Sequence, residues 1–438
     1  MIFLRITLAA LTLGVFIGSL FLPPIATLVL SSEQAETFSQ NVEPEPLEIY
    51  CPGGAVLQGG DAGTDIGSFE LVAAAELAVA GESEPGSLPE SIESGILITS
   101  PDLTADQSTL LLAGNQILEA SEKRMAGLSS LNCAQPANQG IFITGNNSVG
   151  TESLLIVSNP QEVETVVDLE VFGLEQLTTQ KLVLAAGEQK YLSLSGLAGD
   201  ASAYGLRFRS SGGPVSLVMQ QRTISGLQPT GIETTDWLTE PIATGAFPIV
   251  KVLGSQLSPE ADLTQPTLRV YNPAQNPAQI DVSLFSSSSS KKVNLTVQPN
   301  QFLDTQLDLS DGNWSATFES DTEVFAAVRN PVFGQAADYE WLYPANEIEN
   351  ALRIPLSRPG ELHLVNPSTE AITYQIEGYG QIQLGANQRR TLAISAEEVS
   401  VAGKQIWAAV SFTTSVGYAV TEPKENRNFG ADLQVVIH

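Results

Sequence analysis

The chain is poor in the residues that carry most enzyme chemistry. Its 438 residues include two histidines and two cysteines, and the common nucleophile, phosphate-loop and dinucleotide motifs do not occur. His438 is the last residue and His363 lies in an apolar stretch, so a serine–histidine–aspartate triad has no good base. We therefore predict that the chain is not an enzyme and has no catalytic residue, cofactor or metal ion. One alternative stays open, a carboxylate pair that hydrolyses glycosides, although nothing in the sequence selects such a pair.

Positive charge is also scarce. Lys and Arg number 20 against 49 Asp and Glu, which gives a formal net charge of −29. This field repels phosphate backbones and anionic lipid headgroups, so we expect no nucleic acid partner and no adsorption to a membrane surface. A solvated acidic surface explains the charge most simply, and a polycationic partner would also suit it. The hydrophobic content of 43% is enough for packed cores and excludes wholesale disorder.

Long hydrophobic runs are absent except at the N-terminus. Residues 6–30 are uncharged, and a helix rising about 1.5 Å per residue over this length would cross a hydrocarbon core of roughly 30 Å. A cleaved signal peptide is the alternative, but its apolar core usually spans about 7 to 15 residues before a small-x-small site. We favour a single-pass anchor over residues 1–31. Arg5 before the run and acidic residues after it place the body outside the cytoplasm, or secrete it if the segment is cleaved.

The two cysteines are Cys51 and Cys133. In an exported chain an isolated pair most simply forms one disulfide, which we predict here. Closing a loop of this length stabilises the fold by roughly 4 to 5 kcal/mol in the chain-entropy model. A metal site is the weaker alternative, because two thiols need further ligands and histidine is scarce.

An internal repeat is the strongest signal beyond the N-terminus. Three apolar strands each end in Asn-Pro, at Asn159-Pro160, Asn272-Pro273 and Asn366-Pro367. Each is followed by a second strand with period-2 alternation, over residues 165–172, 278–285 and 371–378. Two further strands follow in each copy. The sequence then favours a hairpin, pairing 204–208 with 214–218, 314–318 with 324–328, and 406–412 with 416–420.

Short strands separated by turn signals, about seven within roughly 80 residues, are typical of an immunoglobulin-like or fibronectin-like sandwich. We therefore predict an all-β chain with three tandem sandwich modules. The stretch 69–79 is ambiguous between strand and helix. The expected parts are an anchor or signal peptide (1–31), an acidic stalk (32–48), a disulfide-linked N-terminal region (49–139), and modules over 140–244, 245–348 and 349–438.

The repeated asparagines suggest a structural role. Proline removes a ladder donor and ends the strand, and the residue before it is kept extended. The short asparagine amide can then bond to the backbone of the following turn. We predict that Asn159, Asn272 and Asn366 occupy one equivalent position and that each contributes about 1 kcal/mol.

Tryptophan follows an acidic residue at two module exits, in Asp236-Trp237 and Glu340-Trp341. We interpret these rings as wedges between neighbouring modules. The alternative is that Trp237, Trp341 or Trp407 is exposed and stacks on a sugar ring.

The order of these features resembles an uncharacterised family of actinobacterial envelope proteins, a domain of unknown function. The resemblance rests on an N-terminal membrane segment, Cys51-Pro52, Cys133 before the strand 141–145, and the strand that ends at Pro160. This chain lacks the aromatic pair that the family shows at Phe142. The resemblance covers residue 49 to the C-terminus, implies a cell-envelope setting near glycan assembly, and assigns no catalytic residue.

Three functions follow from these observations. The first is an exported, non-enzymatic scaffold or interaction protein whose modules dock an envelope protein, with the membrane contacted only through the N-terminal helix. The second is a glycan-binding protein, and the third is the carboxylate-dependent hydrolase.

Overall fold

The computed structural model describes residues 36–41, 46–59, 68–81, 88–100, 112–254, 265–334, 336–345, 347–424 and 432–437. Strands take up 67% of the structure and helix 1%, which confirms an all-β protein. The one short helix described, α2, spans Ser195–Ala198.

The chain divides into two units, Pro44–Phe429 and a unit made of Met1–Glu43 with Gly430–His438. In the second of these, β1 (Glu36–Asn41) pairs antiparallel with β32 (Asp432–Ile437). The predicted anchor over residues 1–31 lies outside the described residues. Among the residues that are described, no helix is long and apolar enough to cross a membrane.

The N-terminal region of the large unit is built of paired strands. β2 (Glu48–Gly53) pairs with β7 (Ser94–Thr99), and β3 (Ala55–Gln58) pairs with β4 (Phe69–Ala73). A four-stranded sheet has the order β6-β5-β8-β9, from Ser91–Ile92, Ala75–Ala80, Ala113–Glu122 and Met125–Asn132. The ambiguous stretch 69–79 is therefore strand, in β4 and β5.

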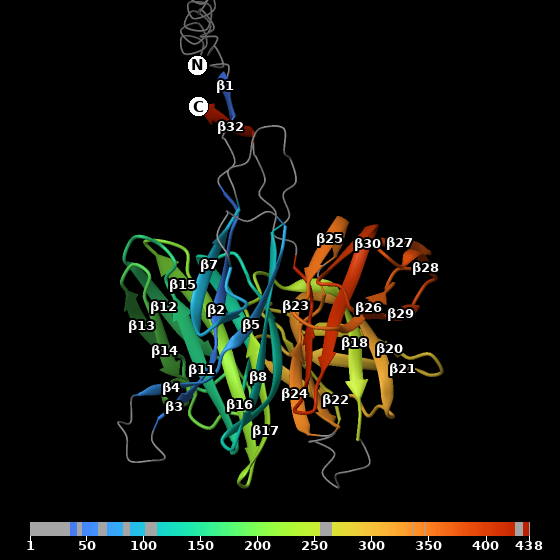
Figure 1. Cartoon of the computed structure of the whole chain (residues 1–438), viewed down its shortest axis with the longest axis horizontal. Helices are drawn as coiled ribbons and strands as arrows, with labels where there is room; N and C mark the ends of the chain where they lie inside the picture. The colour runs from blue at the N-terminus through green and yellow to red at the C-terminus, as the bar shows by residue number, and fades with distance from the viewer. Residues whose placement is uncertain are drawn as a thin grey trace, which may run out of the picture. The chain divides into compact units, whose positions relative to one another are not determined.

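Three later segments share one strand order, as the strand pairings show. In the first segment (residues 139–235) the two sheets run β10-β15-β12-β13 and β14-β11-β16-β17. The second segment (242–342) has β18-β23-β20-β21 and β22-β19-β23-β24, and the third (348–421) has β25-β30-β27-β28 and β29-β26-β30-β31. The repeat in the sequence is therefore a repeat of strand pairing. Figure 1 shows the three segments in chain order, coloured from green through yellow and orange to red.

The strands β12, β20 and β27 lie at or within the predicted ranges 165–172, 278–285 and 371–378. In the first segment the strands are β10 Gln139–Gly145, β11 Thr151–Ser158, β12 Thr165–Phe172, β13 Thr178–Leu184, β14 Gln189–Ser193, β15 Tyr204–Ser211, β16 Ser216–Ser225 and β17 Gln228–Thr235. In the second they are β18 Ile242–Val252, β19 Thr267–Tyr271, β20 Ala278–Phe285, β21 Ser290–Val297, β22 Phe302–Gln306, β23 Gly312–Phe333 and β24 Ala337–Leu342. In the third they are β25 Ile348–Pro355, β26 Gly360–Val365, β27 Ile372–Ile376, β28 Gly380–Leu384, β29 Arg389–Ile394, β30 Glu398–Thr413 and β31 Tyr418–Thr421.

Two of the three predicted hairpins are wrong. β15 and β16 lie in different sheets, so the chain changes sheet at Gly212 and Gly213 instead of turning back. In the second segment β23 runs unbroken through both sheets, because residues 319–323 contain no glycine or proline to end it. Only β30 and β31 pair as predicted. Alternation reports which face of a strand is buried, and it does not report which sheet the strand joins.

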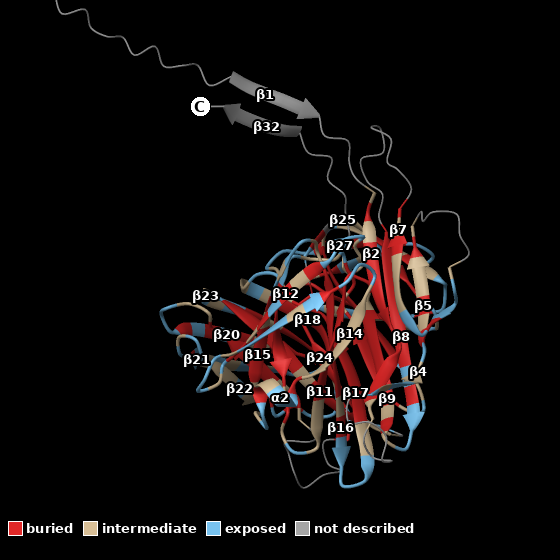
Figure 2. Cartoon of the chain, turned by 90° about the vertical axis from the view of Figure 1, so that its left-hand side faces the viewer, coloured by how far each residue is buried: buried red, intermediate tan, exposed pale blue. Residues whose placement is uncertain are grey.

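Each segment has its own apolar core, and the N-terminal region has another around its disulfide. Buried residues fill the middle of the large unit, while exposed residues collect on loops and edge strands (Figure 2). Four strands from different parts of the chain, β9, β17, β24 and β31, contact one another inside this unit. The region where these four strands contact one another, called the meeting place below, contains the candidate site.

Candidate functional site

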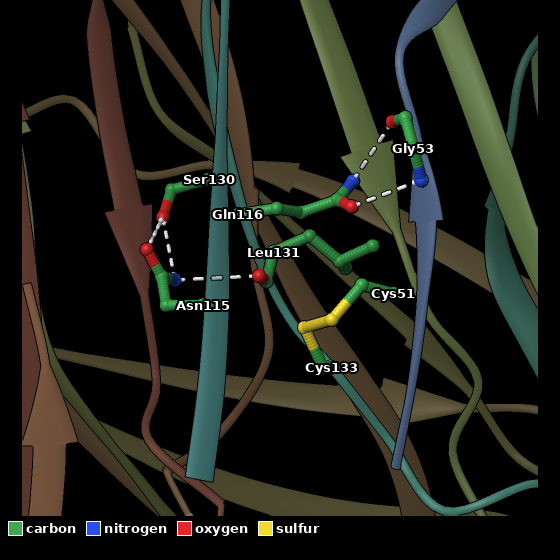
Figure 3. The surroundings of a disulfide bond; sticks show 7 residues. All are labelled: Cys51, Gly53, Asn115, Gln116, Ser130, Leu131 and Cys133. Atoms are coloured by element: carbon green, nitrogen blue, oxygen red, sulfur yellow. Dashed lines mark hydrogen bonds between the residues drawn. A yellow bond between two sulfur atoms is a disulfide. The ribbon is translucent and has the colours of Figure 1, made fainter. Parts of the chain in front are cut away.

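The predicted disulfide is present. Cys51 in β2 is bonded to Cys133, which follows β9, and their Cα atoms are 4.5 Å apart. Gln116 holds β2 beside the bond by accepting from the backbone N–H of Gly53 at 3.1 Å and donating to its carbonyl at 3.3 Å. Asn115 donates to the carbonyl of Leu131 at 3.3 Å on the other side (Figure 3). The bond therefore joins the start of the large unit to the strand that enters the meeting place.

The three Asn-Pro positions have the same hydrogen-bond pattern. Each asparagine is at most 1% exposed and donates to the carbonyl four residues later, Val163 at 2.7 Å, Asn276 at 2.8 Å or Glu370 at 2.6 Å. Each also donates to the last carbonyl of a neighbouring strand, that of Leu184, Val297 or Leu384. The amide thus bonds to the turn, as the sequence predicts, and also fastens that turn to β13, β21 or β28.

Trp237, Trp341 and Trp407 are buried, so the alternative in which these rings are exposed on the surface is wrong in that respect. Their exposed fractions are 6%, 4% and 8%. Burying an indole ring removes a large apolar area from water, so these rings stabilise the cores in which they pack. Trp407 belongs to the core of the third segment.

The wedge interpretation holds for one tryptophan of the two. Trp341 packs in a cluster with Ile141 and Ile143 of the first segment, and its indole N–H donates to Gln221 at 2.9 Å. Trp237 instead lies in the core of the first segment, edge-on to Phe208 at 5.6 Å between ring centroids. Trp341 lies within β24, whereas Trp237 follows β17, so the similar letters occupy different places.

Arg269 forms a junction that the sequence did not reveal. Its side chain is 2% exposed, and it binds Asp304 in a two-pronged ion pair at 2.8 Å for both contacts. The same guanidinium donates to the carbonyls of Gly145 at 2.8 Å and Ser202 at 2.9 Å in the first segment. It therefore ties the second segment to the backbone of the first.

His363 occupies the matching place in the third segment. Its Nδ1 lies 3.0 Å from the hydroxyl of Thr391 and its Nε2 lies 2.8 Å from that of Ser411. Burial, with Arg389 and Lys251 nearby, lowers the pKa of His363 to about 3. Because of this lowered pKa the imidazole ring is neutral at pH 7, and it contributes to the packing of the third segment.

Buried carboxyl groups gather where β9, β17, β24 and β31 meet. Asp338 is 2% exposed and accepts backbone N–H groups from Leu128 at 2.8 Å, Tyr339 at 3.0 Å and Tyr418 at 3.0 Å. Burial raises the pKa of Asp338, and these donors oppose part of that rise. One carboxyl thus binds strands from the N-terminal region, the second segment and the third.

Glu233 in β17 and Glu340 in β24 form a carboxyl pair beside Asp338. Their exposed fractions are 2% and 0%. Burial raises the pKa of both groups well above the usual value, and the nearby carboxyl of Asp338 raises both further. Among the described residues, neither oxygen of Glu340 nor Oε2 of Glu233 has a hydrogen-bond partner.

A cavity of about 250 Å³ opens at one end of this meeting place. Three carboxyl groups line it, those of Glu233, Asp236 and Glu422, together with one cation, Lys424. Lys424 forms an ion pair with Asp236, whose side chain is 8% exposed. Burial, and then the charge of Asp236, raises the pKa of Glu422 to about 8.

The rest of the cavity lining combines aromatic rings with small polar groups. The aromatic residues are Trp237, Trp341 and Tyr343, and the polar ones include Asn132, Gln135, Thr235 and Thr239. Among the described residues, no group of three or more His, Cys, Asp or Glu is placed to hold a metal ion. The arrangement can hold a small polar ligand that donates hydrogen bonds.

Sequence reasoning missed these carboxyls, although a signal was present. Glu340 lies between Tyr339 and Trp341, and Glu233 follows Gly231-Ile232, in stretches that read as buried strand. A charged residue flanked by large apolar ones in a strand indicates burial, which is rare for Glu without a partner.

A model of one protein family matches residues 97–350, described as a family of unknown function, DUF5719. Because this match spans more than half of the chain, the chain belongs to that family. No curated protein matches the chain.

Among solved structures, the crystal structure of Thermotoga maritima 1070 is 14% identical, with a TM-score of 0.22, over 24% of this chain and 94% of that one. A tetra-tandem repeat from the extending region of a large adhesion protein is 12% identical, with a TM-score of 0.12, over 89% of this chain and 94% of that one.

Proposed function

We propose that this member of the DUF5719 family is a non-enzymatic scaffold or interaction protein of an actinobacterial cell envelope. Residues 1–31 anchor it in the membrane, its three segments act as immunoglobulin-like or fibronectin-like modules outside the cytoplasm, and its partner belongs to the glycan-assembly machinery. The apolar run over residues 6–30 supports this setting.

The disulfide supports the location. Cys51 and Cys133 are both fully buried and bonded, and such bonds persist in oxidising compartments and are rare in the cytosol. An exported body is the simplest setting for a structural disulfide in a chain with two cysteines.

The observation that carries the scaffold role is the way the segments are joined. Arg269 binds backbone carbonyls of the first segment, and Asp338 accepts N–H groups from three parts of the chain. Such buried polar contacts fix the segments at set positions, because moving any of them leaves a polar group without a partner. A scaffold needs surfaces held at fixed spacing in this way, whereas linkers that let modules move independently would lack these contacts.

Two measurements test the proposal. The full chain should fractionate with membranes and be digested by protease added to intact cells lacking an outer barrier, and deletion of residues 1–31 should abolish export.

Photo-crosslinking residues placed at exposed edge positions, such as Gln180 in β13 and Gln381 in β28, should capture one envelope protein reproducibly. Protection from external protease would contradict the location, and enzymatic turnover of an envelope polysaccharide by the purified chain would contradict the non-enzymatic role.

Glycan binding is the second candidate. The cavity that Trp237, Trp341 and Tyr343 line beside carboxyl and amide groups favours it, because aromatic rings with a few convergent polar groups are typical of small-molecule sites. The ligand would enter this cavity and not stack on an exposed ring.

A further inference from the structure

The cavity at the end of β9, β17, β24 and β31 contains more acid than base. Glu233, Asp236 and Glu422 line it, and Lys424 is the one cation among the described lining residues. Lys424 already pairs with Asp236. The carboxyl groups of Glu233 and Glu422 also line the cavity, and neither forms an ion pair with a described lining residue, although the charge of Lys424 acts on Glu422.

Glu233 is the group that points to a ligand. It is 2% exposed, it lines the cavity, and its Oε2 has no hydrogen-bond donor among the described residues. A buried oxygen left without a donor costs free energy, and the cost is larger for a charged group than for a neutral one. A donor that enters the cavity would recover this loss, so the site is complete only when such a donor is bound.

The lining indicates which donor fits. No metal-binding group of three ligands is present among the described residues, so an organic cation fits better than a metal ion. The rings of Trp237, Trp341 and Tyr343 contribute apolar lining, and Asn132, Gln135 and Thr239 contribute hydrogen-bonding groups. Ammonium groups are attracted to aromatic faces and to carboxylates, and hydroxyl groups suit the amides and threonine.

We propose that this cavity binds an amino sugar, whose ammonium group donates to Glu233 and Glu422 while its ring lies against the aromatic lining. The cavity volume of about 250 Å³ is below the roughly 300–1,000 Å³ of pockets for drug-sized ligands, which matches a single sugar unit. The inference deepens the second candidate function, glycan binding, and does not depend on the scaffold role.

Binding should release protons. Burial brings the pKa of Glu422 to about 8, so at pH 7 this carboxyl mostly holds its proton in the empty cavity, and burial also raises the pKa of Glu233. An ammonium group favours the ionised forms, and its arrival expels protons to the solvent. The apparent binding enthalpy at pH 7 should therefore depend on the ionisation enthalpy of the buffer.

The test is calorimetric titration of the full chain in detergent with glucosamine, N-acetylglucosamine and butylamine. Glucosamine should bind with proton release, and N-acetylglucosamine, which lacks the charge, should bind at least ten-fold more weakly. Equal affinity for the two sugars, or no heat with glucosamine at millimolar concentration, would overturn the proposal. Butylamine binding as tightly as glucosamine would overturn the sugar part of it.

Two matched variants localise the effect. Glu233→Gln keeps the shape and loses the charge, and it should weaken glucosamine binding about ten-fold. Glu323→Gln makes the same change at an exposed carboxyl that does not line the cavity, and it should leave the affinity within two-fold. Equal losses in both variants would show an effect that is not specific to the cavity and would overturn the assignment.

Glu422→Gln provides a second test if Glu233→Gln does not fold, as judged by its melting curve. It should also weaken binding and remove the proton released at pH 7, and an unchanged affinity would contradict the site. Membrane fractionation of each variant should match the unchanged chain, so a failed ligand test is distinguishable from a failed scaffold role.

Discussion

The large unit has two kinds of interior, and they differ in how they are held together. The core of the first segment consists of apolar side chains such as Phe142, Leu155 and Phe208. The meeting place of β9, β17, β24 and β31 instead buries Glu233, Asp338 and Glu340. The apolar core is stabilised by removing surface from water, which does not depend on direction. The meeting place depends on directed hydrogen bonds and on proton occupancy, so it specifies how the segments join.

The largest expected effect is in the apolar interior. Replacing Phe208, which is 0% exposed and contacts Trp237, with Ala should lower the free energy of unfolding by about 4 kcal/mol. The loss should be the same at pH 5 and pH 8, because no titratable group is involved. Denaturant unfolding at both pH values measures it, and a loss that changes with pH would show that the two interiors are not separable.

The second-largest loss of stability is expected at the Asn-Pro positions. Asn272→Ala leaves the carbonyls of Asn276 and Val297 without their donor, so we expect a loss of about 3 kcal/mol in the free energy of unfolding. This exceeds the roughly 1 kcal/mol expected from the sequence, since the amide bonds to a neighbouring strand as well as its own turn. Ser288→Ala, at an exposed position, is the control and should change stability by less than about 0.5 kcal/mol. Equal effects of the two substitutions would contradict the role of Asn272 in joining its turn to β21.

The asparagines of the three Asn-Pro positions show which features can be predicted from the sequence and which cannot. Alternating residues and the Asn-Pro repeat predicted the strands and the position of the asparagines, because these are local properties of the chain. The second bond, from Asn272 to Val297 at the end of β21, depends on which strands neighbour each other. The failed hairpin at β15 and β16 has the same cause, since sheet membership is decided by long-range packing.

The candidate site was hidden for a related reason. Asp338 and Glu340 follow the pattern of a linker beside a tryptophan, and composition alone treats them as part of a solvated acidic surface. Their burial arises only when strands from three parts of the chain meet, which no short motif encodes. The disulfide was predictable because two cysteines in an exported chain leave one pairing.

The carboxyl pair should make stability depend on pH. The pKa values of Glu233 and Glu340 are raised in the folded chain above the usual 4.5, so the folded state holds more protons than the unfolded state. Stability is then full below about pH 4.5 for this pair and falls as pH rises, with a slope of up to about 1.4 kcal/mol per pH unit for each extra proton. Glu340→Gln should flatten the decline between pH 5 and pH 8, as measured by melting curves across that range. An unchanged slope would contradict a raised pKa for Glu340 in the folded chain.

The smallest expected effect is at a partly exposed ion cluster that joins the third segment to the N-terminal region. Arg358 binds Glu76 at 2.5 Å and Glu119 at 2.6 Å, with its side chain 18% exposed. Arg358→Lys keeps the charge and loses the fork that contacts both carboxylates, so we expect a loss of about 1 kcal/mol that shrinks in high salt. Lys181→Arg, at the exposed pair with Asp168, is the control and should change stability by a few tenths of a kcal/mol at most. Denaturant unfolding at low and at about 1 M salt separates the two cases. A loss at Arg358 that persists in high salt would show that this ion cluster is not screened by solvent. The cluster would then belong with the buried polar contacts of the meeting place and not with the surface ion pairs.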